Sequence, residues 1–254
     1  LSSSVDPFVN SVTIGRVLRH AVLTTALIVA LTSALAGCGD EEGSLSQARE
    51  YAKEPGNQIA EDARAAMHDI KTVHVEGDVL DSESTKITVD LDVSADDACV
   101  GKVSIGDGQI SLRSIDGSAW YQGDEEFWKS IAPAKGEGER IAKRVGEKWV
   151  KLEGELASLR AFCSIDSLTD QMVPAEAEAQ AIGPAMAADG PAVRLDVTHG
   201  ETESRTYVLA SEPHRIVKWT QGSSGELTFS DFDKEFQVEE PPADEVFDLA
   251  ELEK

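Results

Sequence analysis

Strict alternation of apolar and polar residues constrains the fold of this chain most. Residues 73–79 read VHVEGDV and residues 87–93 read ITVDLDV. A period of two predicts β-strands in which one face is buried and the other meets solvent. Because such strands are apolar on one side only, we expect the sheet they form to be covered on that side.

Turn-forming residues separate this pair from further strand-like segments. Gly106-Asp107-Gly108 and Asp116-Gly117 are strong hairpin signals. The sequence therefore predicts an antiparallel meander that continues after an intervening helical region. The further strands are expected at 99–105, 109–115, 118–121, 192–198, 204–210, 215–221 and 226–232.

Apolar residues recur at helical spacing in three other segments. A helix capped by Asn57 is expected over 58–71, and two more over 139–152 and 156–172. The alanine-rich residues 175–186 read as a helix end or a loop. The predicted fold class is α+β, with a large curved antiparallel sheet, a half-barrel, that is wrapped around or covered by helices.

The N-terminal region has the pattern of a lipoprotein signal peptide. Arg16 and Arg19 precede an uncharged, largely apolar run over residues 21–35, which ends in Leu35-Ala36-Gly37-Cys38. The run is short for a membrane span, which needs about 20 apolar residues. Small residues crowd its far end, as signal cleavage requires. We therefore expect cleavage between Gly37 and Cys38 and acylation of Cys38, for example with palmitate.

This signal leads to a three-part organisation. Residues 1–37 are expected to be a signal peptide with an upstream extension, residues 38–56 a lipidated N-terminus and polar tether, and residues 57–254 a single globular domain. The expected location is extracytoplasmic, at the cell membrane, with the acylated Cys38 as the lipid anchor. The formal net charge of −24 argues against a nucleic-acid partner, because phosphates would be repelled.

Two of the three cysteines remain once Cys38 is assigned to the anchor. Cys99 and Cys163 form an even pair in an oxidising compartment, which predicts a disulfide. Neither has a histidine or a second cysteine at ligand spacing, so a metal role is not expected.

A search for catalytic patterns finds none that supports an enzyme. The chain has no HExxH, no GxSxG, no phosphate-binding loop and no dinucleotide-binding GxGxxG. We therefore expect no catalytic residues, no metal site and no cofactor. The expected protein is not an enzyme.

The aromatic residues are few but grouped. Trp120, Phe127 and Trp128 lie close together in the sequence, while Trp149 and Trp219 lie elsewhere. These five are candidates for lining an apolar cavity between sheet and helices. Core packing needs the same residue types, so the sequence leaves both interpretations open.

Three stretches also carry a resemblance to a known family. They are Leu35-Ala36-Gly37-Cys38, the run from Cys99 to Tyr121, and the aromatic residues in Phe127-Trp128 and Lys148-Trp149. Together with the order of elements over about 58–249, they resemble actinobacterial lipoproteins of the LolA-like superfamily, near the mycobacterial LppX/LprAFG lipid-carrier group. The resemblance implies a half-barrel with an apolar pocket for acyl chains and a lipid or lipoglycan ligand.

The expected function is therefore that of a membrane-anchored lipoprotein that binds or transfers lipid without catalysis. The alternative is an envelope interaction or sensory module with a packed core and no lipid ligand. Its protein partner is not identified by the sequence.

Overall fold

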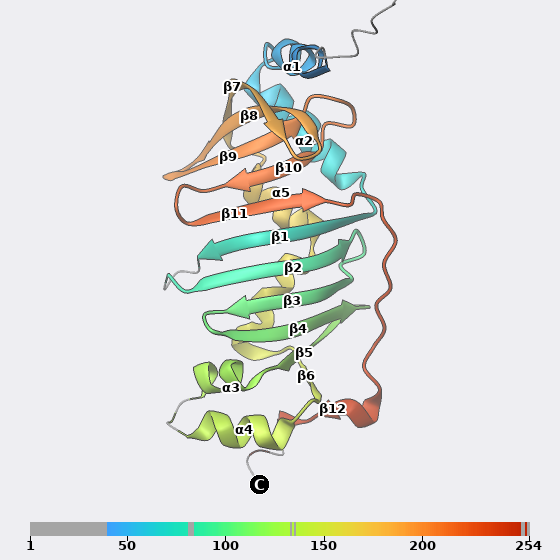
Figure 1. Cartoon of the computed structure of the whole chain (residues 1–254), viewed down its shortest axis with the longest axis vertical. Helices are drawn as coiled ribbons and strands as arrows, with labels where there is room; N and C mark the ends of the chain where they lie inside the picture. The colour runs from blue at the N-terminus through green and yellow to red at the C-terminus, as the bar shows by residue number, and fades with distance from the viewer. Residues whose placement is uncertain (1–39, 81–83, 133, 135, 250–251, 253–254) are drawn as a thin grey trace, which may run out of the picture. The chain divides into compact units, whose positions relative to one another are not determined.

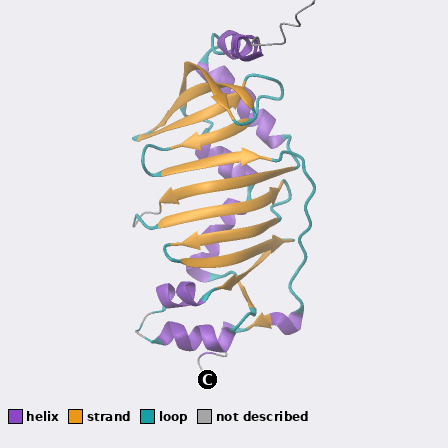
Figure 2. Cartoon of the chain, in the orientation of Figure 1, coloured by secondary structure: helices purple, strands orange, loops and turns teal. Residues whose placement is uncertain are grey.

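The computed structural model describes residues 40–80, 84–132, 134, 136–249 and 252, which belong to one compact unit, Cys38–Lys254. In this part of the chain, twelve strands form one open sheet (Figures 1 and 2). The strands are β1 (Thr72–Leu80), β2 (Lys86–Ser94), β3 (Cys99–Ile105), β4 (Gly108–Ile115), β5 (Ser118–Gly123), β6 (Trp149–Lys151), β7 (Glu178–Ala187), β8 (Gly190–His199), β9 (Thr202–Leu209), β10 (Ile216–Thr220), β11 (Gly225–Ser230) and β12 (Val246–Phe247).

The sheet consists of two antiparallel meanders joined side by side. Its strand order is β12-β6-β5-β4-β3-β2-β1-β11-β10-β9-β8-β7. β1 and β11 join the meanders, with Val75 opposite Phe229. The short β12 pairs with β6 in parallel, and the other neighbours are antiparallel. The predicted fold class is confirmed: an α+β fold with a large, open, curved sheet.

Helices lie against one face of this sheet and at its two ends (Figure 2). In the orientation of Figure 1, η1 and α5 pass behind the central strands, while α3 and α4 lie beyond β4 and β5. The helical segments are α1 (Asp40–Tyr51), α2 (Gly56–His68), α3 (Glu125–Ile131), α4 (Glu137–Val145), α5 (Ile165–Met172) and the 3₁₀ segments η1 (Gly154–Cys163) and η2 (Ala243–Glu245).

The chain after β11 returns along the ends of the strands to the far edge of the sheet (Figure 1). It is fastened near β1, where the Lys71 N–H donates to the Asp233 carboxylate over 2.8 Å and Thr72 Oγ1 donates to the Lys234 carbonyl over 2.9 Å. We call residues 233–245 the strap. The strap ends in η2 and leads into β12, which pairs with β6 at the edge of the sheet.

Residues 40–51 differ from the flexible tether expected over 38–56. They form α1, whose Ala48 is fully buried and whose Tyr51 ring stacks on His214 at 4.0 Å between centroids. The Gln47 amide also donates to the Ala210 carbonyl over 3.2 Å. These contacts with the second meander give this polar segment the partners that an isolated stalk would lack.

Three local predictions were wrong. Residues 175–186 do not end a helix, because β7 runs from Glu178 and pairs with β8. Trp149 lies in β6, although its spacing suggested a helix. Asn57 does not cap α2; its side-chain oxygen accepts a hydrogen bond from the Ala179 N–H of β7 over 2.8 Å. In each case, pairing or contact with a distant segment decided the local structure.

Candidate functional site

The candidate site is the covered face of the sheet, which we call the inner face. Strand alternation turns every second residue toward it, for example Val75, Leu91 and Leu112, each of which is fully buried. The residues beside them in the strands, such as His74 and Asp90, are the polar members of the same alternation and lie on the other face. The inner face thus carries the apolar half of the alternation found in the sequence.

Three helical segments, α2, η1 and α5, cover the inner face, and we call them the cover. Their apolar side chains join the strand residues in one buried cluster. The cover residues in this cluster are Ile59, Ala60, Ala63, Met67, Leu159, Cys163, Ile165, Leu168 and Met172.

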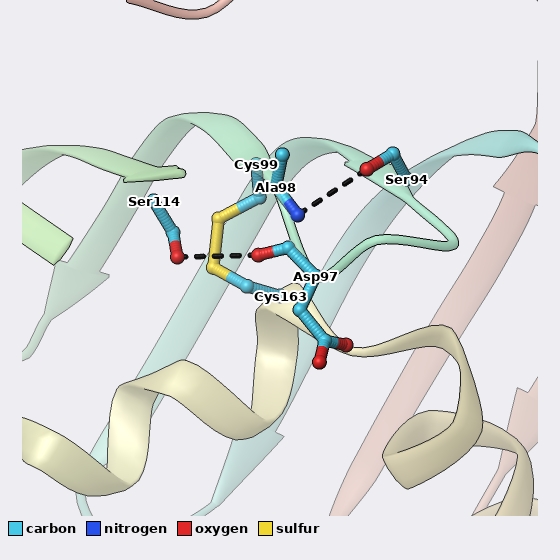
Figure 3. The surroundings of a disulfide bond; sticks show 6 residues. All are labelled: Ser94, Asp97, Ala98, Cys99, Ser114 and Cys163. Atoms are coloured by element: carbon cyan, nitrogen blue, oxygen red, sulfur yellow. Dashed lines mark hydrogen bonds between the residues drawn. A yellow bond between two sulfur atoms is a disulfide. The ribbon is translucent and has the colours of Figure 1, made fainter. Parts of the chain in front are cut away.

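A disulfide between Cys99 and Cys163 ties the cover to the sheet. It joins the start of β3 to the end of η1, with 5.3 Å between the Cα atoms. Figure 3 shows its surroundings, where Ser114 Oγ donates to the Asp97 carbonyl over 3.2 Å. The pairing expected from the cysteine count is the pairing present in the structure.

Further polar contacts hold the last helix of the cover. Thr206 Oγ1 on β9 donates to the Met172 carbonyl at the end of α5 over 3.2 Å. His68 on α2 and Asp166 on α5 form a pair, with 2.7 Å between Nδ1 and Oδ1. Arg64 Nη1 on α2 also donates to the Val173 and Pro174 carbonyls, over 3.5 Å and 3.4 Å. The cover is therefore fixed at its centre by the disulfide and beyond it by a small set of hydrogen bonds.

The interior is apolar and carries no buried charge among the described residues. The buried polar side chains recorded there are Ser114, Thr169 and Thr206. Burial raises the pKa of Tyr121 to about 12, because its charged phenolate form would be desolvated there. A low-polarity interior of this kind suits an uncharged apolar guest and disfavours a buried charged group.

The five aromatic candidates do not lie together. Phe127 and Trp128 of α3 pack against Tyr121 of β5, with ring centroids 5.5 Å and 5.8 Å from it. Phe127 lies close over Gly108 and Gly123, where any side chain would overlap it. This aromatic group closes one end of the interior.

Trp219 faces the interior from the other meander, as a member of the buried cluster on β10. Trp120 and Trp149, in contrast, lie on the outer face. Trp120 lies opposite Arg113 in the ladder, and the Arg113 guanidinium is 4.4 Å from the Trp149 ring centroid. The expectation that Trp120 and Trp149 line the interior is therefore corrected. Each is next in its strand to an inward-facing residue, so its own side chain points outward, and the Trp149 ring makes a cation–π contact instead of lining a cavity.

A row of partly buried apolar residues crosses the ends of three strands on the inner face. Val79, Ile87 and Ile105 are direct partners in neighbouring ladders, and each packs against the buried cluster. We call them the strand-end row. Gly225 lies beyond Val79 and Gly108 beyond Ile105, so the row extends from near Trp219 to Phe127.

The strand-end row was missed as a site by the sequence analysis. The alternation marks Val79 and Ile87 as inward-facing, but incomplete cover depends on where distant helices end. The sequence did carry one signal for this row: Val79 and Ile87 are the inward-facing residues closest to the turn of their hairpin.

The hollows recorded in the described part of the chain lie at the surface. One of about 520 Å³ lies beside Asp196, Glu203 and Arg205, at the β8–β9 end of the sheet. Another of about 610 Å³ lies under the strap, beside Phe236 and Val238. The interior itself is filled by the side chains of the buried cluster.

Other expected features can be placed only in part. Gly37 and Cys38, the cleavage and lipidation positions, lie outside the described residues. Within the described ranges, no helix is long and apolar enough to cross a membrane. The same ranges hold no group of three or more His, Cys, Asp or Glu residues that could bind a metal ion.

Comparisons with known proteins rest on structure, since no family model and no curated protein sequence matches the chain. The structure is similar to that of LprF from Mycobacterium bovis, with 13% identity and a TM-score of 0.49 over 73% of this chain and 96% of that one. It is also similar to the LolA superfamily protein NE2245 from Nitrosomonas europaea, with 11% identity and a TM-score of 0.23 over 75% and 96% of the two chains.

A third similar structure is the MucA/MucB complex of Pseudomonas aeruginosa, with 11% identity and a TM-score of 0.33 over 74% of this chain and 58% of that one. The similar structures thus include proteins with the two names given in the sequence resemblance, an Lpr lipoprotein and a LolA superfamily protein. At these identities the likeness concerns the fold, and the argument about function proceeds from the residues of this chain.

Proposed function

We propose that this protein is an extracytoplasmic lipoprotein, anchored through an acylated Cys38, that binds or transfers lipid without catalysis. The acyl chains of the lipid would lie between the inner face and the cover. The observation that carries the proposal is an interior without buried charge among the described residues, which continues into the partly buried strand-end row.

The energetics of this role require apolar area and no charged group. Each buried CH₂ of an acyl chain contributes about 0.8 kcal/mol. The strand-end row offers apolar side chains that the cover leaves partly accessible, and it leads directly into the buried cluster. An acyl chain that first contacts Val79, Ile87 and Ile105 can therefore continue inward along a surface of the same polarity.

Lipid uptake also requires part of the cover to move, because side chains fill the interior. The disulfide holds the end of η1 to β3, so movement belongs to the segments beyond that point. The glycine-bearing segment Gly136–Gly138 is a poor hinge, because Gly138 fits so closely against α3 that a side chain there would overlap the Lys129 backbone. Displacement of α5 breaks the hydrogen bond from Thr206, the exposed pair between His68 and Asp166, and the hydrogen bonds that Arg64 of α2 donates to the carbonyls just after α5.

The proposed anchor is close in sequence to the folded unit. α1 begins at Asp40, two residues after Cys38, and its buried Ala48 fixes it to that unit. Acylation at Cys38 would therefore keep the sheet near the membrane. We expect Cys38→Ser to move the protein from the membrane fraction to the soluble fraction; unchanged membrane association would contradict anchoring at this residue.

A charge placed in the strand-end row tests lipid binding at this site. Ile105→Asp places a carboxylate on the inner face, whereas the matched control Ser104→Asp places it on the outer face of the same strand. We expect Ile105→Asp to weaken binding of palmitoyl lipid in vesicle-transfer assays at least about 10-fold, since a carboxylate must then be desolvated. The control should bind like the wild type, and equal effects of both variants would contradict the proposal.

The filled interior favours a second candidate function, an envelope interaction or sensory module with a packed core. Such a module would use the sheet and strap as a rigid surface for a protein or polymer partner. The two functions differ in one observable: a lipid carrier holds lipid after purification or on exposure to lipid, and an interaction module runs at its bare mass in both conditions.

A further inference from the structure

Two polar groups inside the apolar interior have no hydrogen-bond partner among the described residues. They are Nε1 of Trp219 on β10 and Oγ1 of Thr169 on α5. Trp219 is 8% exposed and Thr169 is fully buried. Buried indole N–H and hydroxyl groups are nearly always paired, so each such atom calls for a partner.

The two groups belong to elements that are linked through Thr206 on β9. Trp219 lies directly opposite Thr206 in the ladder between β10 and β9, and Thr206 donates to the Met172 carbonyl of α5. Thr169 precedes Met172 by three residues, which places both on the same side of the helix. Thr206 therefore lies between the two elements that carry the unpartnered atoms, as the ladder partner of Trp219 and as the hydrogen-bond donor to α5.

Trp219 also lies at one end of the strand-end row. Its ring packs over Gly225, where an added Cβ would be 3.3 Å from the ring. Gly225 is the ladder partner of Val79, the first residue of the row. An acyl chain lying along the row would therefore bring its own polar end to the indole of Trp219.

We propose that the interior binds an acyl ester, with the ester carbonyl accepting a hydrogen bond from Trp219 Nε1 and with Thr169 Oγ1 as a second polar contact. This assignment rests on the proposed lipid-binding function and adds the chemistry that the ligand must carry. An indole N–H requires an acceptor, and an interior without buried charge among the described residues favours a neutral one. A charged headgroup, in contrast, would remain outside the sheet.

Two probes of similar length separate the ester from the chain. Methyl palmitate carries the carbonyl, and hexadecane does not. We expect the wild-type protein to bind methyl palmitate about 2- to 10-fold more tightly than hexadecane, as one net hydrogen bond allows. The indole N–H signal of Trp219 in an ¹⁵N-labelled protein should shift with methyl palmitate and stay in place with hexadecane.

Three variants identify the residues responsible. Trp219→Phe keeps an aromatic ring without the donor, Thr169→Val keeps the shape without the hydroxyl, and Trp149→Phe is the matched control on the outer face. We expect the first to abolish the preference for the ester, the second to reduce it, and the control to keep it. If Trp219→Phe does not fold, the ester preference of Thr169→Val and the indole N–H signal of the wild type still decide whether these atoms bind the ester.

The outcomes distinguish this inference from the function on which it rests. Equal binding of both probes by the wild type, or an ester preference that survives Trp219→Phe, overturns the ester subsite and leaves lipid binding intact. An indole signal that responds to neither bound probe shows that these atoms bind water only, which also overturns it. Failure of the wild type to bind either probe overturns the proposed function together with the inference.

Discussion

Tyr121 illustrates how one side chain reports on the covered interior. It is 3% exposed, and burial raises its pKa from 10.0 to about 12. Between these two values the unfolded chain loses the phenolic proton while the folded chain keeps it. The folded state then binds more protons, so the free energy of unfolding falls as the pH rises.

Tyr121→Phe tests this linkage. The tyrosine contribution is constant below about pH 10 and is lost between about pH 10 and 12, so the variant should lose less stability than the wild type over that interval. Urea unfolding midpoints at pH 9 and pH 11 provide the comparison. Tyr51, whose pKa burial also raises, remains in both proteins and acts in the same direction. Parallel losses in the two proteins would show that Tyr121 is not buried as described.

Gly101 is a residue that the curved sheet requires. Its φ of +152° is unfavourable for other residues, and an added Cβ would overlap the carbonyl oxygen of Asp90 on the neighbouring strand. Close approach of two backbones at this point lets β2 and β3 bend together over the cover.

We predict that Gly101→Ala lowers the free energy of unfolding by about 3 kcal/mol. The matched control is Gly117→Ala, since Gly117 also has a positive φ, of +73°, but has nothing within 4 Å of an added Cβ. The control should cost about 1–2 kcal/mol from backbone strain alone. Denaturant unfolding measures both values, and equal costs would mean that β2 and β3 do not approach so closely.

At the scale of elements, the disulfide is the firmest connection between cover and sheet. It spans a sequence separation of 64 residues, for which the chain-entropy account gives about 4 kcal/mol of stabilisation. It also keeps the end of η1 beside β3 when α5 is displaced. The cover is thus divided into a fixed part and a part that can move.

Removal of the disulfide should lower stability while leaving the sheet intact. We expect Cys99→Ala with Cys163→Ala to reduce the free energy of unfolding by about 2–4 kcal/mol, measured by denaturant unfolding. The wild type in reductant controls for the small cavities that the alanines leave, and it should lose a similar amount. An unchanged midpoint in both samples would mean that the two cysteines are not bonded in the folded protein.

The strands were predicted best where local pattern and final environment agree. β1 and β2 have one buried and one wet face, which is the condition under which period-two alternation arises. β7 escaped prediction because four of its ten residues are alanine and a Gly183-Pro184 pair interrupts them. Pairing with β8 and an edge position, where a bulge and a proline are tolerated, make it a strand.

The site was predictable in class but not in its residues. An apolar interior follows from one-sided strands and amphipathic helices. The assignment of Trp120 and Trp149 to the outer face depends on strand register, which a list of aromatic residues does not contain. The unpartnered atoms of Trp219 and Thr169 depend on packing between segments 50 residues apart, so no local pattern marks them.

At the scale of the whole molecule, charge and polarity are separated. The net charge of −24 belongs to a chain whose described interior contains no buried charge. In the proposed role, the acidic surface would favour solubility and repel anionic headgroups, while a single acylated residue would keep the protein at the membrane. This separation is consistent with the proposed binding of apolar ligands near a membrane.

Native mass spectrometry on the Cys38→Ser variant, which carries no covalent acyl anchor and is secreted by an actinobacterial host, tests the central claim, lipid binding between sheet and cover, most directly. Bound material would be released and identified after the intact mass is measured, and the emptied protein would then be offered host lipids. Our account predicts a stoichiometric acyl lipid above the mass of the disulfide-bonded chain. A protein that runs at its bare mass, and stays empty when offered lipid, would contradict it and favour the interaction module.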